Sequence, residues 1–262
     1  MAIGWICMKK PFLMIIGYTA AIVIAFPIVY MILSSLFIDG RFSLDSYYQI
    51  LLRRPDFILK FWNSFMLSLM IVLVQFIASC LAAFALAKYS FRGKRTVFVV
   101  LMVLMMLPAQ TVLVPNYIVF SRLDLLNTWW PLVVSGSFSP FGAVLMAQAF
   151  RAVPNEILEA AQLDGAKPLR ILWNLVVPVA HGGAISLVIL SFIDAWNMVE
   201  QPVAFISDKS LYPLSVFLAF FNQENQALSF ACGTLSLVPG LLLFLYYRDI
   251  LAEGIKYHGI DR

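Results

Sequence analysis

The sequence is poor in charge. Only 12% of its 262 residues are Asp, Glu, Lys or Arg, whereas 62% are hydrophobic. A soluble domain carries about 25% charged residues and roughly half apolar ones. This deficit argues against a chain that is solvated on all sides. The apolar residues instead fall in runs long enough for membrane helices, which need roughly 20 residues each, so we expect a multi-pass integral membrane protein.

Residues that carry chemistry are also scarce. Cys7, Cys80 and Cys232 are far apart and form no CxxC pair, and His181 and His258 add no metal-ligand spacing. The sequence has no HExxH and no GxSxG motif. It also lacks the GxxxxGK[ST] loop whose backbone N–H groups would hold nucleotide phosphates. We therefore expect no catalytic residue, no metal and no cofactor. The net charge of +4 reflects topology, not a nucleic-acid partner.

Six apolar runs predict an all-α protein with six transmembrane helices in a single domain, residues 1–262. The runs cover residues 11–37, 62–87, 96–119, 129–150, 175–199 and 227–247. Pro27 is expected to kink the first helix, and Pro108 and Pro115 to bend the third, because neighbouring helices tolerate proline in a membrane. No linker, low-complexity tract or clear internal repeat divides the chain.

The distribution of Lys and Arg sets the orientation. With the N-terminus inside, the inside segments hold 12 of the 18 Lys and Arg residues and the outside segments hold 6. Basic residues near helix ends resist translocation. Both termini are therefore predicted to be cytoplasmic, together with the loop at residues 151–174 and the tail at residues 248–262.

The inside loop has the composition of two short helices joined by a tight turn. Glu156 and Glu159 favour the dipole at the start of the first helix. Gly165 suits a left-handed helix end, and Pro168 suits the first turn of the next helix. The small side chains of this first helix would let another protein approach closely. Two interpretations follow from the composition: a docking elbow, or an amphipathic loop lying on the membrane surface.

The spacing within this loop resembles the EAA loop of permeases in binding-protein-dependent ABC importers, EAA-x3-G-x9-I-x-L-P. The matching residues are Glu159, Ala160, Ala161, Gly165, Leu175, Val177 and Pro178. Every spacing of the pattern is kept. Leu175 stands in place of Ile and Val177 in place of Leu, and both are conservative in bulk.

The resemblance covers the chain from about Tyr47 to the C-terminus and is greatest to the MalG-type permeases of carbohydrate importers. Similar motifs include Asn63-Ser64, Leu126-Asn-Thr128 and Trp196-Asn197. The last nine residues, Gly254–Arg262, have the length of the family's glycine-rich tail. The amino-acid sequence differs there, since His258 and Asp261 replace a glycine and a lysine. No role is assigned to these two residues.

The resemblance implies a type I ABC importer permease fold in a bacterial or archaeal cytoplasmic membrane. It also implies three kinds of protein partner: a dimer of ATP-hydrolysing subunits, a second homologous permease and an extracytoplasmic solute-binding protein. The solute would be an oligosaccharide or related carbohydrate. By residue-to-residue transfer, the ATPase cleft would receive Glu159, Ala160, Ala161, Leu163, Asp164 and Gly165.

Three residues late in the fifth helix are candidates for the substrate pathway. Asp194 is an ionisable group in a membrane segment, which is by default a functional candidate, although it could also reach interfacial water. Trp196 suits sugar stacking and equally an interfacial aromatic belt, and Asn197 accompanies it in the family motif.

Other functions stay open at this stage. The chain could be a permease for a non-sugar solute, or a self-sufficient secondary transporter or channel. The lack of an inverted repeat and the few intramembrane charges count against a self-sufficient transporter. No motif in the sequence supports a membrane enzyme.

Overall fold

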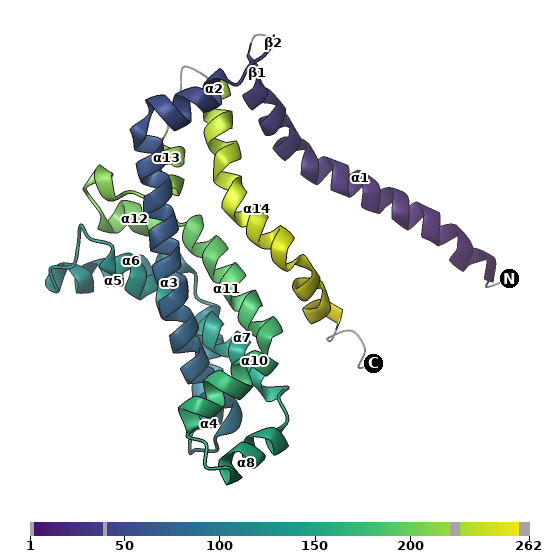
Figure 1. Ribbon diagram of the computed structural model, residues 1–262, viewed down its shortest axis with the longest axis vertical. Helices are drawn as coiled ribbons and strands as arrows, with labels where there is room; N and C mark the ends of the chain where they lie inside the picture. The colour runs from purple at the N-terminus through teal and green to yellow at the C-terminus, as the bar shows by residue number, and fades with distance from the viewer. Residues whose placement is uncertain (1–2, 39–40, 221–225, 257–262) are drawn as a thin grey trace. The chain divides into compact units, whose positions relative to one another are not determined.

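The computed structural model describes residues 3–38, 41–220 and 226–256. The regular structure of these residues is helical apart from one pair of two-residue strands. The chain falls into two compact units. Unit 1 comprises Met1–Ile58 and Phe220–Val238, and unit 2 comprises Leu59–Ala219 and Pro239–Arg262. Figure 1 shows the elements of both.

Unit 1 begins with a long helix. Its first elements are α1 (Ile3–Leu36), β1 (Phe37–Ile38), β2 (Arg41–Phe42), α2 (Asp45–Tyr48) and the π-helix η1 (Gln49–Arg53). The strands pair antiparallel with Phe37 opposite Phe42. The hydroxyl oxygens of Ser35 and Tyr47 lie 2.6 Å apart and tie the end of α1 to α2. Pro27 lies inside α1 without ending it.

Helices suited to a membrane dominate the described residues. Four are long and apolar enough to cross one, and six spans result if each of two bent helix pairs counts as one. The prediction of an all-α, multi-pass membrane protein is confirmed. Four of the predicted spans are unbroken or nearly so, and two are sharply bent.

The second span is longer than its apolar run. Helix α3 (Pro55–Lys88) begins seven residues before the predicted start at Trp62. Pro55 occupies the first helical position, where a missing N–H costs nothing, and Asp56 favours the helix dipole. The segment before Trp62 is too charged to count as apolar, but Lys60 is 7% exposed. Its ammonium is satisfied by the backbone carbonyls of Lys209 and Ser210.

The third span breaks where the sequence places a proline. Helix α4 (Lys94–Met105) and helix α5 (Ala109–Arg122) meet at an angle of 100°. Pro108 precedes α5 in an extended conformation. Proline lacks a backbone donor and disfavours helical geometry in the residue before it, so α4 ends before Leu107. Pro115 lies inside α5 without such a break. The bend expected from both prolines is therefore made by one.

The remaining helices of unit 2 follow in short succession. They are α6 (Trp130–Ser137), α7 (Pro140–Arg151), α8 (Asn155–Leu163), α9 (Pro168–Ile171), the π-helix η2 (Leu172–Val176), α10 (Val177–Val179), α11 (His181–Trp196), α12 (Glu200–Phe205), the 3-10 helix η3 (Lys209–Leu211) and α13 (Leu214–Ala219). The fifth span is bent by 86° between Val179 and His181. Ala180 makes this break, since its ψ of 26° departs from helical geometry.

The last helix, α14 (Gln226–Lys256), contributes to both units. Within unit 1, Phe230 packs edge-on against Tyr30 of α1, with ring centroids 5.9 Å apart. The helix continues through the first part of the tail predicted at residues 248–262. The departures from the family tail at His258 and Asp261 lie outside the described residues.

Candidate functional site

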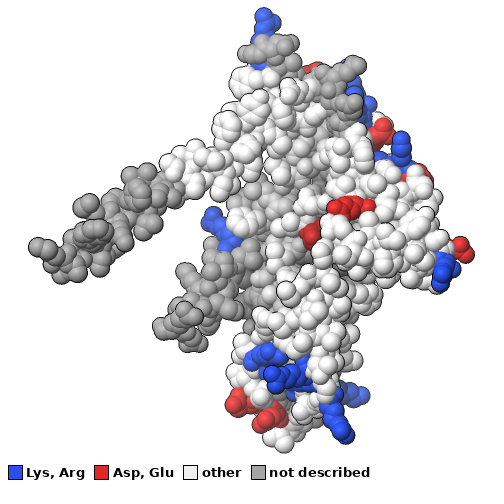
Figure 2. Space-filling view, turned by 180° about the vertical axis from the view of Figure 1, so that it is seen from behind, with Lys and Arg blue, Asp and Glu red and all other residues white. Residues whose placement is uncertain are grey.

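The predicted docking loop forms a helical elbow at one end of unit 2. Helix α8 and the short α9 are joined by a turn at Asp164–Lys167. Figure 1 shows α8 at the same end of unit 2 as α4. Figure 2 shows Lys and Arg gathered at that end, with Asp and Glu beside them. The two short helices expected from the sequence are present, and they carry charge on an exposed loop.

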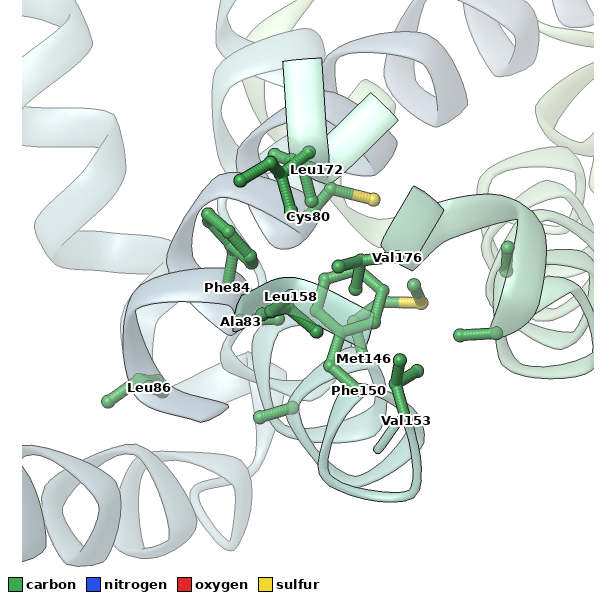
Figure 3. Close-up of a cluster of buried hydrophobic side chains, with 14 of the residues drawn as sticks. Cys80, Ala83, Phe84, Leu86, Met146, Phe150, Val153, Leu158, Leu172 and Val176 are labelled. Carbon is green, nitrogen blue, oxygen red and sulfur yellow. The ribbon is translucent and has the colours of Figure 1, made fainter. Parts of the chain in front are cut away.

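One side chain anchors α8 to the helices behind it. Leu158 is 6% exposed and belongs to a cluster of buried apolar side chains. Figure 3 shows it among side chains from α3, α7 and η2. The buried members of this cluster are Cys80, Ala83, Phe84, Leu86, Met146, Ala147, Phe150, Val153, Leu158, Ile171, Leu172, Val176, Ala180, Ala184 and Leu187. Full burial of a leucine is worth about 1.5–3 kcal/mol, which holds α8 firmly on the unit.

The start of α8 is held by a cation from α3. The Lys88 ammonium donates to the backbone carbonyl of Val153 and to Asn155 Oδ1, the latter at 2.9 Å. Lys88 is the last residue of α3. A hydrogen bond from a charged donor contributes about 1.5–3 kcal/mol. The inner end of a long membrane helix is therefore linked directly to the elbow.

The turn after α8 has a defined geometry. Gly165 has φ +77°, in the left-handed region. Its N–H donates to the Gln162 carbonyl at 2.9 Å, and the Ala166 N–H donates to the Ala161 carbonyl at 3.0 Å. These two bonds make a Schellman motif, in which a glycine ends the helix and the last carbonyls are satisfied. Gly165 therefore fixes the direction in which the chain leaves α8.

The outer face of α8 is exposed and largely apolar at its end. Leu163 is 90% exposed, and Glu159 and Ala160 are exposed on the same side. Positions 159, 160 and 163 fall on one face because three and four residues separate neighbours on a helix. Ala161 lies on the other side and packs against the buried cluster. The two alanines of the motif thus have different surroundings.

The second half of the motif lies inside the unit. Leu175 and Val177 are partly buried and pack against the same cluster as Leu158. Trp173 in this segment has its ring centroid 6.1 Å from that of Phe76 of α3. The motif residues after the turn therefore pack the elbow against the helices of unit 2. Most of the motif residues before the turn are exposed instead.

The three candidate pathway residues are separated by burial. Trp196 is 7% exposed and stacks on Phe192 at a centroid distance of 5.6 Å, with Phe61 edge-on at 5.4 Å. Asp194 is exposed. Asn197 is also exposed and caps α11, because its Nδ2 donates to the Ile193 carbonyl at 2.8 Å. The helix thus presents Asp194 and Asn197 outward and holds Trp196 among aromatic rings.

A polar cluster that we name the outer knot was not foreseen. Asn63 Nδ2 donates to the carbonyls of Ser210 and Tyr212 at 2.7 and 3.1 Å. Asn127 Oδ1 accepts from the N–H groups of Ser207 and Asp208. The knot joins the start of α3 and the α5–α6 connection to the segment between α12 and α13. The sequence signal was present in the Asn63-Ser64 and Leu126-Asn-Thr128 motifs, whose partners sequence spacing does not reveal.

Side chains that could hold a metal do not gather in the described part of the chain. No group of three or more His, Cys, Asp or Glu side chains is placed to do so there. The chemistry available at the elbow is therefore that of contact: an apolar knob, a small residue and a carboxylate, held on a rigid base.

Comparisons with known proteins agree with this architecture. Residues 75–257 match the family model described as "Binding-protein-dependent transport system inner membrane component". The arabinooligosaccharides transport system permease protein AraQ of Halalkalibacterium halodurans is 23% identical and covers 95% of each chain. The sn-glycerol-3-phosphate transport system permease protein UgpE of Pectobacterium atrosepticum is 30% identical over 74% of this chain and 70% of its own.

A solved structure shares the fold. It is the crystal structure of a bacterial ABC transporter involved in the import of the acidic polysaccharide alginate, matched with a TM-score of 0.84 and 20% identity. The match covers 93% of this chain and 96% of that chain. The permease fold that the sequence resemblance implies is confirmed.

Proposed function

The chain belongs to the family of inner membrane components of binding-protein-dependent transport systems, and from this premise we propose that it transmits ATP-driven motion through the α8 elbow during carbohydrate import. It is a multi-pass membrane component of such a system. ATP hydrolysis takes place on a separate subunit, bound as a dimer. The other half of the translocation path comes from a second, homologous permease, and a solute-binding protein delivers the solute from the extracytoplasmic side.

The exposure pattern of α8 carries the coupling proposal. Leu163, which is 90% exposed, is an apolar side chain on the outer face of a helix whose inner face is anchored by Leu158. An exposed apolar knob on a rigid base fits a groove in a partner protein. Glu159 and Ala160 lie on the same face. Asp164 and Gly165 form the turn that follows α8, and this turn directs the chain away from the contact.

The solute class is supported by the relatives. Arabinooligosaccharides and sn-glycerol-3-phosphate are named for the two sequence relatives, and alginate for the structural one. All three are carbohydrates or polyol derivatives. Asp194 and Asn197, exposed on α11, are the side chains of the predicted pathway that can contact such a solute. Trp196 orients that part of α11 from inside. A non-sugar solute is the second candidate, and uptake assays with each class decide between them.

The coupling role is tested with the substitutions Leu163→Ala and Glu159→Ala in the assembled transporter. Removing the leucine side chain from a buried contact should weaken ATPase co-purification about tenfold, because its burial is worth roughly 1.5–3 kcal/mol. Solute-stimulated ATP hydrolysis should fall in parallel. Gln162→Ala is the matched control, since Gln162 is exposed on the same helix but lies away from the outer face.

Two outcomes would overturn the proposal in different ways. Unchanged assembly and uptake in both variants would remove the coupling role from this face of α8. Solute uptake by the chain without any ATP-hydrolysing partner would instead favour a self-sufficient transporter. The first outcome leaves membership of the permease family intact, whereas the second contradicts the transport mechanism itself.

A further inference from the structure

A cavity lies beside the elbow, where α4 packs against α7. Its volume is about 650 Å³, within the roughly 300–1,000 Å³ of small-molecule sites. It is open on one side. Three of its eight lining residues are cationic, namely Lys94, Arg95 and Arg151, and none is acidic. None of the residues assigned to coupling is among the residues that line it.

The two arginines are available to a ligand. Neither Arg95 nor Arg151 has an ion-pair partner within the described part of the chain. The Arg151 guanidinium lies over the Phe98 ring, 4.4 Å from its centroid, and this cation–π contact orients it without neutralising it. Lys94 is less free, since its ammonium donates to the Tyr89 carbonyl at 2.9 Å. A guanidinium group offers two parallel N–H donors that match the geometry of a phosphate group.

The cavity also has apolar lining residues. Phe91, Phe98 and Val99 line it, and Phe91 and Val99 are 43% and 50% exposed. Beyond it, α4 continues with exposed apolar side chains such as Val100 and Val103. The cations therefore lie at the start of α4 and the end of α7, and apolar side chains continue from them along α4. This polarity is that of a phospholipid with its headgroup at the cytoplasmic surface.

We propose that this cavity binds the phosphate headgroup of an anionic phospholipid of the cytoplasmic leaflet, with Arg95 and Arg151 as its ligands. Basic pockets between transmembrane helices on the cytoplasmic side hold such headgroups. Topology alone explains basic residues at this end of the chain but treats Arg92 and Arg95 alike. The cavity distinguishes them, because Arg95 lines it and the exposed Arg92 does not.

The test uses the assembled transporter in phosphatidylcholine nanodiscs that contain a small amount of photo-crosslinkable phosphatidylglycerol. Labelling is mapped by mass spectrometry and should fall on the peptides that contain residues 91–99 and Arg151. A cation near an anionic membrane surface is worth about fivefold in binding. The double substitution Arg95→Gln/Arg151→Gln should therefore reduce labelling about 25-fold. Arg95→Lys/Arg151→Lys, which keeps the charge but not the forked donors, should retain only part of it.

Arg92→Gln is the matched control for a single surface charge outside the cavity and should reduce labelling of these peptides by about fivefold at most. Excess inorganic phosphate should not displace the lipid probe, because the apolar lining residues contribute to lipid binding alone. If excess phosphate abolished the labelling, the cavity would be a site for a free anion, and the lipid proposal would be overturned. Equal loss in the Arg92 and the Arg95/Arg151 variants, or no loss in either, would also overturn it.

Discussion

Gly165 controls the elbow through its backbone alone. A Cβ added at this residue would meet nothing within 4 Å, but its φ of +77° is a conformation that other residues rarely adopt. Gly165→Ala should therefore lower the free energy of unfolding by about 1 kcal/mol, the cost of a left-handed non-glycine residue. Gly165→Asn should cost less, because asparagine tolerates this region. Thermal unfolding of the purified chain measures both.

The two variants of Gly165 also separate backbone strain from partner contact. If alanine and asparagine destabilise the isolated chain equally, the turn is not limited by its left-handed geometry. If the isolated chain is unaffected but ATPase binding is lost, Gly165 acts through close approach of the partner. We expect thermal unfolding of the isolated chain to show a larger loss of stability for alanine than for asparagine.

At this scale the sequence predicts the local shape of the elbow but not which distant side chains surround a given residue. The positions of Gly165 and Pro168 in a helix–turn–helix follow from local rules, and the structure places both as expected. The different surroundings of Ala160 and Ala161 depend on which face of α8 meets the bundle. Trp196 is buried by Phe61 and Phe192, and Phe61 comes from a helix more than 130 residues away in the sequence. No local pattern in the sequence contains such contacts.

At the scale of elements, small residues let α7 and α11 approach closely. A Cβ on Gly183 would lie 2.4 Å from the Ala149 Cβ, whereas one on Gly182 would meet nothing within 4 Å. Membrane helices gain most of their association from such packing, because lipid supplies no hydrophobic driving force between them. The two adjacent glycines of α11 thus differ in role, and they offer a matched pair.

Gly183→Ala should destabilise the chain by about 1–3 kcal/mol, the usual cost of overpacking. Gly182→Ala should be neutral or stabilising by up to about 1 kcal/mol, because alanine is the better helix former. The double variant Ala149→Gly/Gly183→Ala moves the methyl group to the other helix and should recover stability lost in Gly183→Ala. Thermal unfolding in detergent reads all three. Equal effects at Gly182 and Gly183 would show that α7 and α11 do not meet at this contact.

Element boundaries show where sequence periodicity stops being informative. Hydropathy finds the six spans but not their breaks, since the run at residues 96–119 contains two prolines of which only Pro108 breaks the helix. The start of α3 at Pro55 is hidden because Lys60 interrupts the apolar run. That lysine is satisfied by carbonyls of the segment after α12, a contact between residues about 150 positions apart.

At the scale of the whole of unit 2, each of its two ends combines an apolar cluster with polar hydrogen bonds, and the two clusters share no side chain. The end with α8 rests on the apolar cluster around Leu158. The outer knot is held by polar side chains such as Asn63, which is 8% exposed and satisfies two backbone carbonyls. Helix α3 runs uninterrupted between them, from Asn63 to Lys88 beside the elbow. At 1.5 Å per residue this stretch is about 37 Å long.

This separation predicts that damage at the two ends adds without coupling. Leu158→Ala should cost about 2–5 kcal/mol as a large-to-small core change. Asn63→Ala should cost about 0.5–1.5 kcal/mol, because it removes the hydrogen bond to the Tyr212 carbonyl, whereas Lys60 still donates to the Ser210 carbonyl. The double variant should equal the sum within about 0.5 kcal/mol, as expected for sites far apart with no shared partner. A double-mutant cycle from denaturant unfolding in detergent measures this, with Ile157→Ala, a more exposed neighbour on α8, as the milder control. A coupling energy well above that limit would mean that α3 transmits strain along its length even without ATP, and that the two ends of unit 2 are already one mechanical element in the resting protein.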